Sequence, residues 1–385
     1  MNLQVFKLVK KYFEKDYSYE AIRHKLKVKL NVEMSCRTLE RVLAENDLKR
    51  KNIDESDLRL IIIAILLELH GPSFNLGYKA MWKRIRKVYN LNVKQNTVMI
   101  VLQELDPVGV ERRRRYQMKN REYEVPGPNF IWHSDGHDKL KQFGFPIYGI
   151  IDGYSRKLLV LEVATTNNNP RVIGHYYLRK VQKLGYIPVL MRVDNGTECG
   201  IMEDLHVTFR LFDQDNNAGV RSFLKGKSTA NQRIECWWRQ LRQKMGDFYI
   251  HLFKQMERER ILDSNNPLHI DLLRFCFGSL VRKDLELTRK EWNEHTIRKQ
   301  NNRNVTSGKP NEMYDYPQKF GARDYKIPLL ISDKIPVLLD KYTDEPRLWS
   351  ENFDRLLEEM PNIQIPTDPE SAFVLFVELV DLSSG

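Results

Sequence analysis

Between Gly226 and Met245 the apolar residues recur at the spacing of an α-helix with one buried face. The apolar stripe lies at positions i, i+4, i+7 and i+11 and consists of Ile234, Trp238, Leu241 and Met245. This period predicts an amphipathic helix. Ser228 or Thr229 is placed to cap its amino-terminal end. Glu235 lies at the edge of the stripe.

The side of this helix that carries Glu235 is polar and basic. Asn231, Arg239 and Arg242 lie four residues before, four after and seven after Glu235, so the four side chains share one side. A carboxylate flanked by amide and guanidinium groups is suited to holding a metal ion and a phosphate together. An ordinary surface glutamate on an amphipathic helix has the same pattern, and the helix alone does not separate the two interpretations.

Four strand-like apolar segments precede this helix: residues 129–135, 146–152, 158–163 and 187–194. The first ends in Asp135, and the last ends in Asp194, which the turn dipeptide Asn195-Gly196 follows. The middle two predict a hairpin. A helix that begins at Asn169-Pro170 and ends at Gly185 then leads to the last strand, a crossover that a parallel strand pair requires.

Carboxylates at strand ends beside a helix carboxylate can converge on one pair of divalent ions. Oxygen ligands of this kind favour Mg²⁺ or Mn²⁺. Two such ions stabilise the attacking and leaving oxygens of a phosphodiester displacement. Other carboxylates compete for this role. We assign Asp152 to the turn at Ser155-Arg156 and Glu198 to the cap of the following helix.

Four motifs resemble the integrase core domain of retroviral-type integrases and related DNA transposons, the DDE group. They are WHSD at 132–135, YGIIDGYSR at 148–156, RVDNGTE at 192–198 and NQRIECWWR at 231–239. The resemblance covers residues 126 to 315, and the long helix predicted from 268 to 292 with the loop after it resembles the element that closes this core. Within this group the chain resembles proteins of eukaryotic Ginger-like transposons and host proteins derived from them.

The resemblance implies an α/β RNase H-like core with a mixed five-stranded sheet. It implies that Asp135, Asp194 and Glu235 are the catalytic triad and hold two Mg²⁺ or Mn²⁺ ions once DNA is bound. Between the aspartates lie 58 residues, and 40 lie between Asp194 and Glu235. The second gap is longer than is usual in the family, with the insertion expected in 207–225. The family's glycine after Asn231 is Gln232 here.

The amino-terminal region predicts two helical units in tandem. In residues 1–52, Ser18 caps a helix through Leu30, and Ser35 caps a helix from 36 to 46, an arrangement typical of a helix-turn-helix. In residues 53–125, helices are expected at 58–70, 77–89 and 97–105, followed by a basic linker. A helical bundle without DNA-binding function has the same pattern.

Charge favours a polyanion as partner. The formal net charge is +11, and residues 1–125 carry about +10, 126–315 about +7 and 316–385 about −6. The side chains expected to contact DNA are Arg37, Arg41, Arg84, Arg112, Arg113, Arg114, Arg115, Lys225, Lys227, Asn231, Arg239 and Arg242. A solvated helix end equally accounts for the arginine run.

The remaining features limit the functional classes. Four scattered cysteines with no C-x-x-C pair indicate a reducing compartment, and with the basic run we expect the nucleus. His24 and Cys36 do not supply a zinc site, so no zinc is expected. The longest apolar run is too short to span a membrane. The acidic tail 316–385 predicts small helices and a protein partner or a lid.

We therefore predict a DNA polynucleotidyl transferase that cleaves DNA ends and joins them to target DNA, as a homo-oligomer when active. A domesticated transposon-derived protein that binds DNA but no longer transposes is the alternative. An RNase H-like nuclease shares the chemistry but predicts no tandem DNA-binding region.

Overall fold

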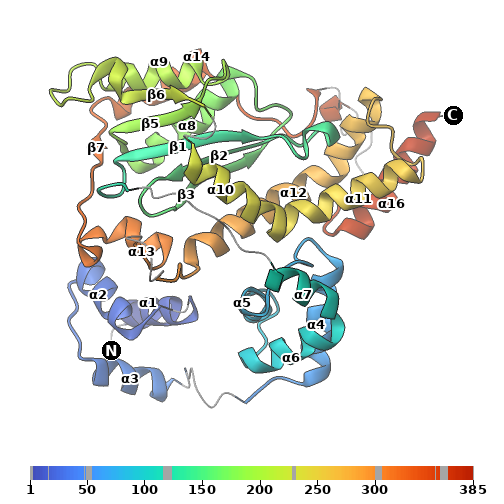
Figure 1. Ribbon diagram of the computed structural model, residues 1–385, viewed down its shortest axis with the longest axis horizontal. Coiled ribbons are helices and arrows are strands. Elements are labelled where there is room, and N and C mark those ends of the chain that lie inside the picture. The colour runs from blue at the N-terminus through green and yellow to red at the C-terminus, as the bar shows by residue number, and fades with distance from the viewer. Residues whose placement is uncertain are drawn as a thin grey trace. The chain divides into compact units, whose positions relative to one another are not determined.

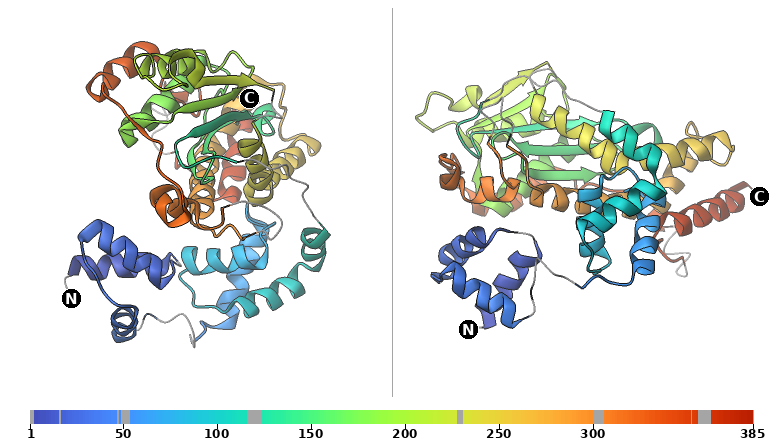
Figure 2. Two further views of the ribbon diagram at one scale, coloured as in Figure 1. Left: turned by 60° about the vertical axis from the view of Figure 1, so that its left-hand side comes forward. Right: turned by 60° about the horizontal axis from the view of Figure 1, so that its bottom comes forward.

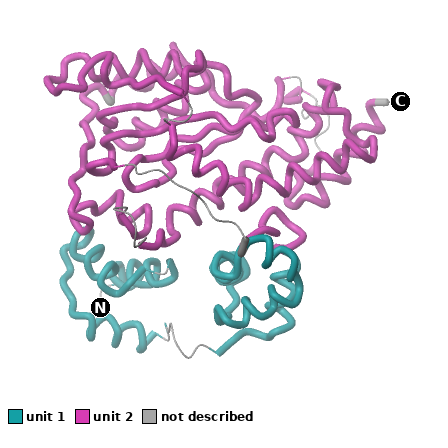
Figure 3. The backbone as a smooth tube through the Cα atoms, in the orientation of Figure 1, with its two compact units in different colours: residues 1–67, 77–115 teal, residues 68–76, 116–385 magenta. Residues whose placement is uncertain are grey.

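The computed structural model describes residues 3–15, 17–46, 48, 54–115, 124–227, 231–299, 306–351, 353–355 and 363–384. The chain divides into two compact units, residues 1–67 with 77–115, and residues 68–76 with 116–385 (Figure 3). Among the described residues, no helix is long and apolar enough to cross a membrane.

The first unit is helical, as its sequence pattern predicts. Its helices are α1 (Leu3–Glu14), α2 (Tyr19–Leu30), α3 (Cys36–Glu45), α4 (Leu58–His70, whose last turn belongs to the second unit), α5 (Tyr78–Val88), α6 (Gln95–Leu105) and α7 (Pro107–Arg115). Ser18 and Ser35 cap α2 and α3 through their side-chain oxygens, as predicted. The buried faces of α1, α2 and α3 share one core that includes Val9, Ile22 and Leu39.

The second unit contains a five-stranded mixed sheet between two layers of helices (Figure 1). Its strands are β1 (Ile131–His137), β2 (Ile147–Asp152), β3 (Leu158–Val163), β5 (Leu190–Asp194) and β6 (Phe223–Gly226), in the spatial order β3-β2-β1-β5-β6. The hairpin pairs are antiparallel, and β1 with β5 and β5 with β6 are parallel. This confirms the predicted RNase H-like α/β core.

The helices of the second unit are α8 (Pro170–Leu184), α9 (Gly200–Phe209), α10 (Gln232–Leu241), α11 (Asp247–Arg258), α12 (Pro267–Glu294), α13 (Pro310–Asp315), α14 (Ile335–Tyr342) and α16 (Pro369–Ser384). Asn169, Pro170 and Gly185 begin and end α8 as predicted. A π-helical segment, Arg242–Gly246, connects α10 to α11. The predicted caps Ser228 and Thr229 lie outside the described residues, and Asn231 occupies the N-cap position of α10.

Each face of the sheet has its own apolar core. On one face α10, α11 and α12 pack against Ile147, Ile151 and Leu158. On the other, α8, α9 and α14 pack against Trp132, Tyr148 and neighbouring side chains. Two further views show the sheet lying between helices (Figure 2). Side chains alternate between the two faces along a strand, so the strands contribute residues to both cores.

Two predicted boundaries differ from the structure. The segment 187–194 is not one strand, because Pro188 interrupts it and has no N–H to donate. Tyr186–Ile187 forms β4, which pairs with β7 (Ile327–Pro328) in a separate two-stranded sheet. The acidic tail is also not set apart from the core, since Phe353 and Phe376 are buried in the same cluster as α12.

Candidate active site

Asp135 lies on β1, and it is one of three residues of this strand whose side chains face α10. His133, Asp135 and His137 alternate along the strand, and each contacts the first two turns of α10. The indole Nε1–H of Trp238 donates a hydrogen bond of 2.8 Å to Oδ2 of Asp135. Burial, with the charges of Asp194 and Glu235 adding to it, raises the pKa of Asp135 to about 7, and the Trp238 bond acts in the opposite direction.

Asp194 ends the neighbouring parallel strand at the same level of the sheet. His133 pairs with Arg192, and Asp135 and Asp194 each lie two residues further along, so both side chains belong to the same face. Burial and the charge of Glu198 raise the pKa of Asp194, whereas a hydrogen bond from Asn231 lowers it. Its Oδ1 atom is buried and has no hydrogen-bond partner among the described residues.

Glu235 completes the group from the first turn of α10. Burial, and to a smaller extent the charge of Asp194, raises the pKa of Glu235, whereas the charge of Arg239 lowers it. The ionisations of the three carboxyl groups are therefore linked. The charges of Asp194 and Glu235 raise the pKa of Asp135, and the charge of Asp194 raises the pKa of Glu235. The structure brings together the three residues that the sequence analysis selected.

The donor set fits a hard divalent cation. It consists of carboxylate oxygens, the ligands that Mg²⁺ and Mn²⁺ prefer, and the unpartnered Oδ1 of Asp194 is a buried acceptor. In their present orientations no three His, Cys, Asp or Glu side chains of the described residues form a group that could hold a metal ion.

The first turn of α10 is tied to β1 through Asn231 and His133. Oδ1 of Asn231 accepts a 2.8 Å hydrogen bond from His133 Nδ1, and its Nδ2 donates to the Ser134 carbonyl at 2.8 Å. Burial lowers the pKa of His133 to about 3, so the ring is neutral and carries its proton on Nδ1. Asn231 is fully buried. Its amide therefore holds β1 against α10, and contact of Asn231 with DNA stays a prediction.

Comparison with known proteins decides the family. The family model for the integrase core domain matches residues 122–314. The chain belongs to the integrase core domain family. A search of curated proteins found no match. Among solved structures, a chain in the cryo-EM structure of a simian T-cell lymphotropic virus intasome in complex with PP2A regulatory subunit B56 gamma is similar at a TM-score of 0.31 and 13% identity, over 66% of this chain and 75% of that one.

The basic side chains assigned to DNA contact in this integrase-core protein differ in exposure. The exposed ones are Arg37, Arg41, Arg112, Lys225, Lys227, Arg239 and Arg242. Arg113 is half-buried and forms an ion pair with Asp106, and the exposed Lys225 forms one with Glu203. The side chains of Arg114 and Arg115 lie outside the described part of the chain.

Arg84 corrects the prediction for α5. It is only 7% exposed, although the sequence analysis expects it to contact DNA. Arg84 lies three residues after Met81 and one before Ile85, so helical geometry places it on the buried side with both. Arg84 is therefore not placed to contact DNA.

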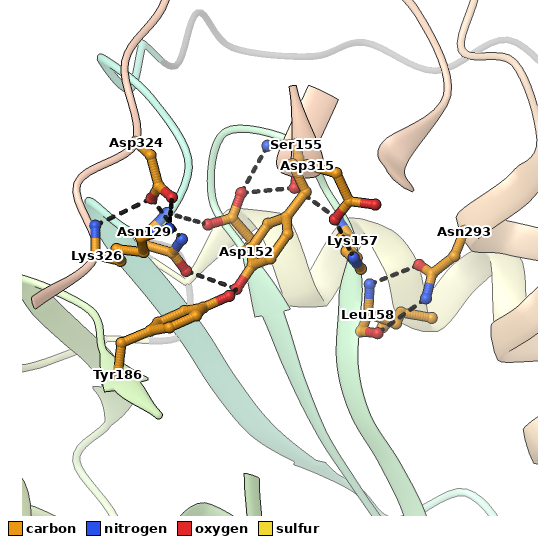
Figure 4. A network of polar contacts seen from close by, with 11 residues as sticks. Asn129, Asp152, Ser155, Lys157, Leu158, Tyr186, Asn293, Asp315, Asp324 and Lys326 are labelled. Carbon is orange, nitrogen blue, oxygen red and sulfur yellow. Dashed lines mark hydrogen bonds and ion pairs between the residues drawn. The ribbon is translucent and has the colours of Figure 1, made fainter. Parts of the chain in front are cut away.

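Asp152 has the turn role that the sequence analysis assigned to it. Its Oδ2 accepts hydrogen bonds from the backbone N–H and the hydroxyl of Ser155, both at 2.7 Å, and Oδ1 accepts from the Asn129 N–H at 2.8 Å. Burial raises the pKa of this carboxyl to about 6. Figure 4 shows Asp152 at the centre of this network. Asn129 also bonds to Asp324 at 2.8 Å, so the network fixes the segment after the core.

Sequence reasoning missed three residues that shape the integrase-core site. Trp238 was assigned to the apolar stripe only, and the structure adds its bond to Asp135. His137 stacks on Trp238 with ring centroids 4.9 Å apart, and Gly149 pairs with Asp135 across the hairpin. The alternation of His133, Asp135 and His137 on one strand was the available signal. Glu198, expected at a helix cap, precedes the N-cap residue Cys199 of α9 and adds its charge near Asp194.

Proposed function

We propose that this integrase-core protein is a metal-dependent DNA polynucleotidyl transferase that cleaves DNA ends and joins them to target DNA. The observation that carries the proposal is the convergence of Asp135, Asp194 and Glu235 from two parallel strands and one helix on a single face of the sheet. The exposed Arg239 on α10 and the exposed Arg242 at the start of the π-helical segment follow Glu235, where they can contact phosphates.

The three carboxylates would hold the divalent ions, Mg²⁺ or Mn²⁺. Bound there, such ions activate a water molecule or a DNA 3′-hydroxyl group and stabilise the leaving oxygen. Asp194 contributes a buried oxygen that has no other partner in the described part of the chain. Asn231 holds α10 against β1, which keeps the helix that carries Glu235 next to both aspartates.

End cleavage and strand transfer with short duplex DNA and Mn²⁺ test this function. Glu235→Gln retains size and hydrogen bonding but loses the charge, so we expect it to abolish both reactions while DNA affinity stays near that of the wild type. Asp138→Asn is the matched control, because Asp138 is an exposed carboxylate three residues from Asp135 that pairs with Lys141. It should cleave like the wild type.

The outcomes separate the alternatives. Cleavage by Glu235→Gln at the wild-type rate would remove Glu235 from the site. A wild type that binds DNA but neither cleaves nor joins any tested end would favour a domesticated DNA-binding protein. In an active protein we expect more than one copy to act together, because two DNA ends and a target must be joined.

A further inference from the structure

Trp238 holds one oxygen of a triad carboxylate, and it does so from the helix that carries Glu235. Its Nε1–H donates to Asp135 Oδ2 at 2.8 Å. Glu235 and Trp238 lie three residues apart on α10, so both project toward β1 from adjacent positions on the helix. The side chain is only 4% exposed, which shields the hydrogen bond from competition with water.

The surroundings of the Trp238 ring are shaped to receive it. Gly149 lies opposite Asp135 on β2, and a Cβ atom there would lie 2.7 Å from the Cη2 atom of Trp238. The ring of His137 stacks on Trp238 at an interplanar angle of 20°. Glycine on one strand and histidine on the next thus leave a slot for the indole. The slot restricts the direction of its N–H.

A carboxylate on a strand otherwise rotates about its terminal torsion, which has a broad, roughly twofold preference. A donor bound to Oδ2 selects one orientation and leaves Oδ1 as the oxygen that can bind a cation. Groups that orient metal ligands in this way commonly change metal affinity or activity by about 10–100-fold when removed.

We propose that Trp238 is a positioning residue that orients Asp135 for divalent-metal binding through its indole N–H. The inference rests on the proposed metal-dependent function, because it assigns a role to Trp238 at that same site. Trp238 itself contacts neither the metal nor DNA in this role. It acts by holding Oδ2 of Asp135 and by coupling the position of β1 to that of α10.

The neighbouring Trp237 provides a matched control. It is also buried, at 1% exposure, but its Nε1–H has no hydrogen-bond partner among the described residues. Replacing either tryptophan by phenylalanine removes similar ring volume, and only Trp238→Phe removes a bond to Asp135. A loss of packing alone should therefore affect both variants similarly.

The first test is direct and does not require turnover. The six tryptophans give six indole N–H signals in a ¹⁵N NMR spectrum of the full chain with a short blunt-ended DNA duplex. Trace Mn²⁺ should broaden the Trp238 signal most, because its proton is hydrogen-bonded to a carboxylate that holds the ion. Trp349, which donates to the unrelated carboxylate of Asp354 at 2.8 Å, should stay sharp.

The second test measures the Mn²⁺ concentration that gives half-maximal end cleavage. Trp238→Phe should raise it about tenfold, the lower end of the range for groups that orient ligands, with little change in the KM for DNA. Trp237→Phe should leave it within about twofold. Equal values for wild type and Trp238→Phe, with Asp135→Asn inactive, would overturn the positioning role while the proposed function stands.

The two failures are distinguishable. If wild-type protein neither cleaves nor shows Mn²⁺ broadening of any indole signal, the proposed metal-dependent function fails and the inference fails with it. If cleavage requires Mn²⁺ and the Trp238 signal stays as sharp as that of Trp349, the ion is not held at Asp135, and both the assignment of Asp135 to the metal site and the inference about Trp238 are overturned. If the Trp238 signal broadens but Trp238→Phe and the wild type need the same Mn²⁺ concentration, only the inference about Trp238 is overturned.

Discussion

His133 and Asn231 are joined by a 2.8 Å hydrogen bond between two fully buried side chains, one on β1 and one at the start of α10. The bond connects parts of the chain 98 residues apart. It places the helix that carries Glu235 against the strand that carries Asp135. The triad therefore depends on a polar contact that none of its members makes.

Asn231→Ala should lower both stability and activity. It leaves the His133 Nδ1–H and the Ser134 carbonyl without their partner, which costs about 1–3 kcal/mol for such buried groups. It also removes the hydrogen bond that lowers the pKa of Asp194. Urea unfolding and end cleavage measure the two effects, with Gln232→Ala as the neighbouring control. Unchanged stability combined with weaker DNA binding would instead make Asn231 a DNA contact.

Asp135 should make the stability of the metal-free protein depend on pH. Its pKa is raised to about 7 in the folded state, against about 3.9 in an unfolded chain. Between these values only the folded state keeps the proton, so the free energy of unfolding falls as pH rises from about 4 to about 7. Asp135→Asn should lack this contribution. Thermal melting from pH 5 to 8 measures it, and parallel profiles for the two proteins would contradict it.

Metal binding should oppose this loss at higher pH. A metal ligand must be deprotonated, so Mn²⁺ has to displace the proton of Asp135 and binds more strongly as pH rises through about 7. Mn²⁺ should therefore raise the melting temperature of the wild type more at pH 8 than at pH 6. Asp135→Asn should show a smaller increase at both values.

Asp152→Asn should destabilise the protein without removing its chemistry. Both carboxylate oxygens of Asp152 accept hydrogen bonds. In the asparagine variant an NH₂ group replaces one of these oxygens, so it faces another donor and that hydrogen bond is lost. We expect a loss of about 1–3 kcal/mol in the free energy of unfolding. Cleavage per folded molecule should stay near the wild-type value. Loss of cleavage in a fully folded Asp152→Asn protein would show that Asp152 takes part in the reaction.

DNA binding should depend strongly on salt and on the exposed face of α3. Neutralising Arg37 and Arg41 together should weaken binding and reduce the salt slope by about two. Lys7→Gln, an exposed lysine on α1, is the control from the same unit and should have a smaller effect. Fluorescence anisotropy with duplex DNA at several salt concentrations measures both. Wild-type affinity in the double variant would remove α3 from the DNA interface.

Local patterns in the sequence were sufficient for most elements. Serine caps, the Asn169-Pro170 start and the Gly185 end predicted α2, α3 and α8 correctly, because these signals act within one turn of the chain. Two predictions were wrong for different reasons. Pro188 divides the predicted strand 187–194, a local signal that the run of apolar residues concealed, whereas Arg84 is buried by tertiary packing, which its charge alone does not indicate.

The sequence by itself selected the three acidic residues, because the motifs that resemble the integrase core domain contain them and can be recognised without any tertiary contact. Only the tertiary structure decided how they are held. The bond from Trp238 to Asp135, the slot at Gly149 and the Asn231 amide between His133 and Ser134 join residues that are distant in the chain. Such contacts depend on strand register and on the approach of α10 to the sheet, and no local pattern specifies either.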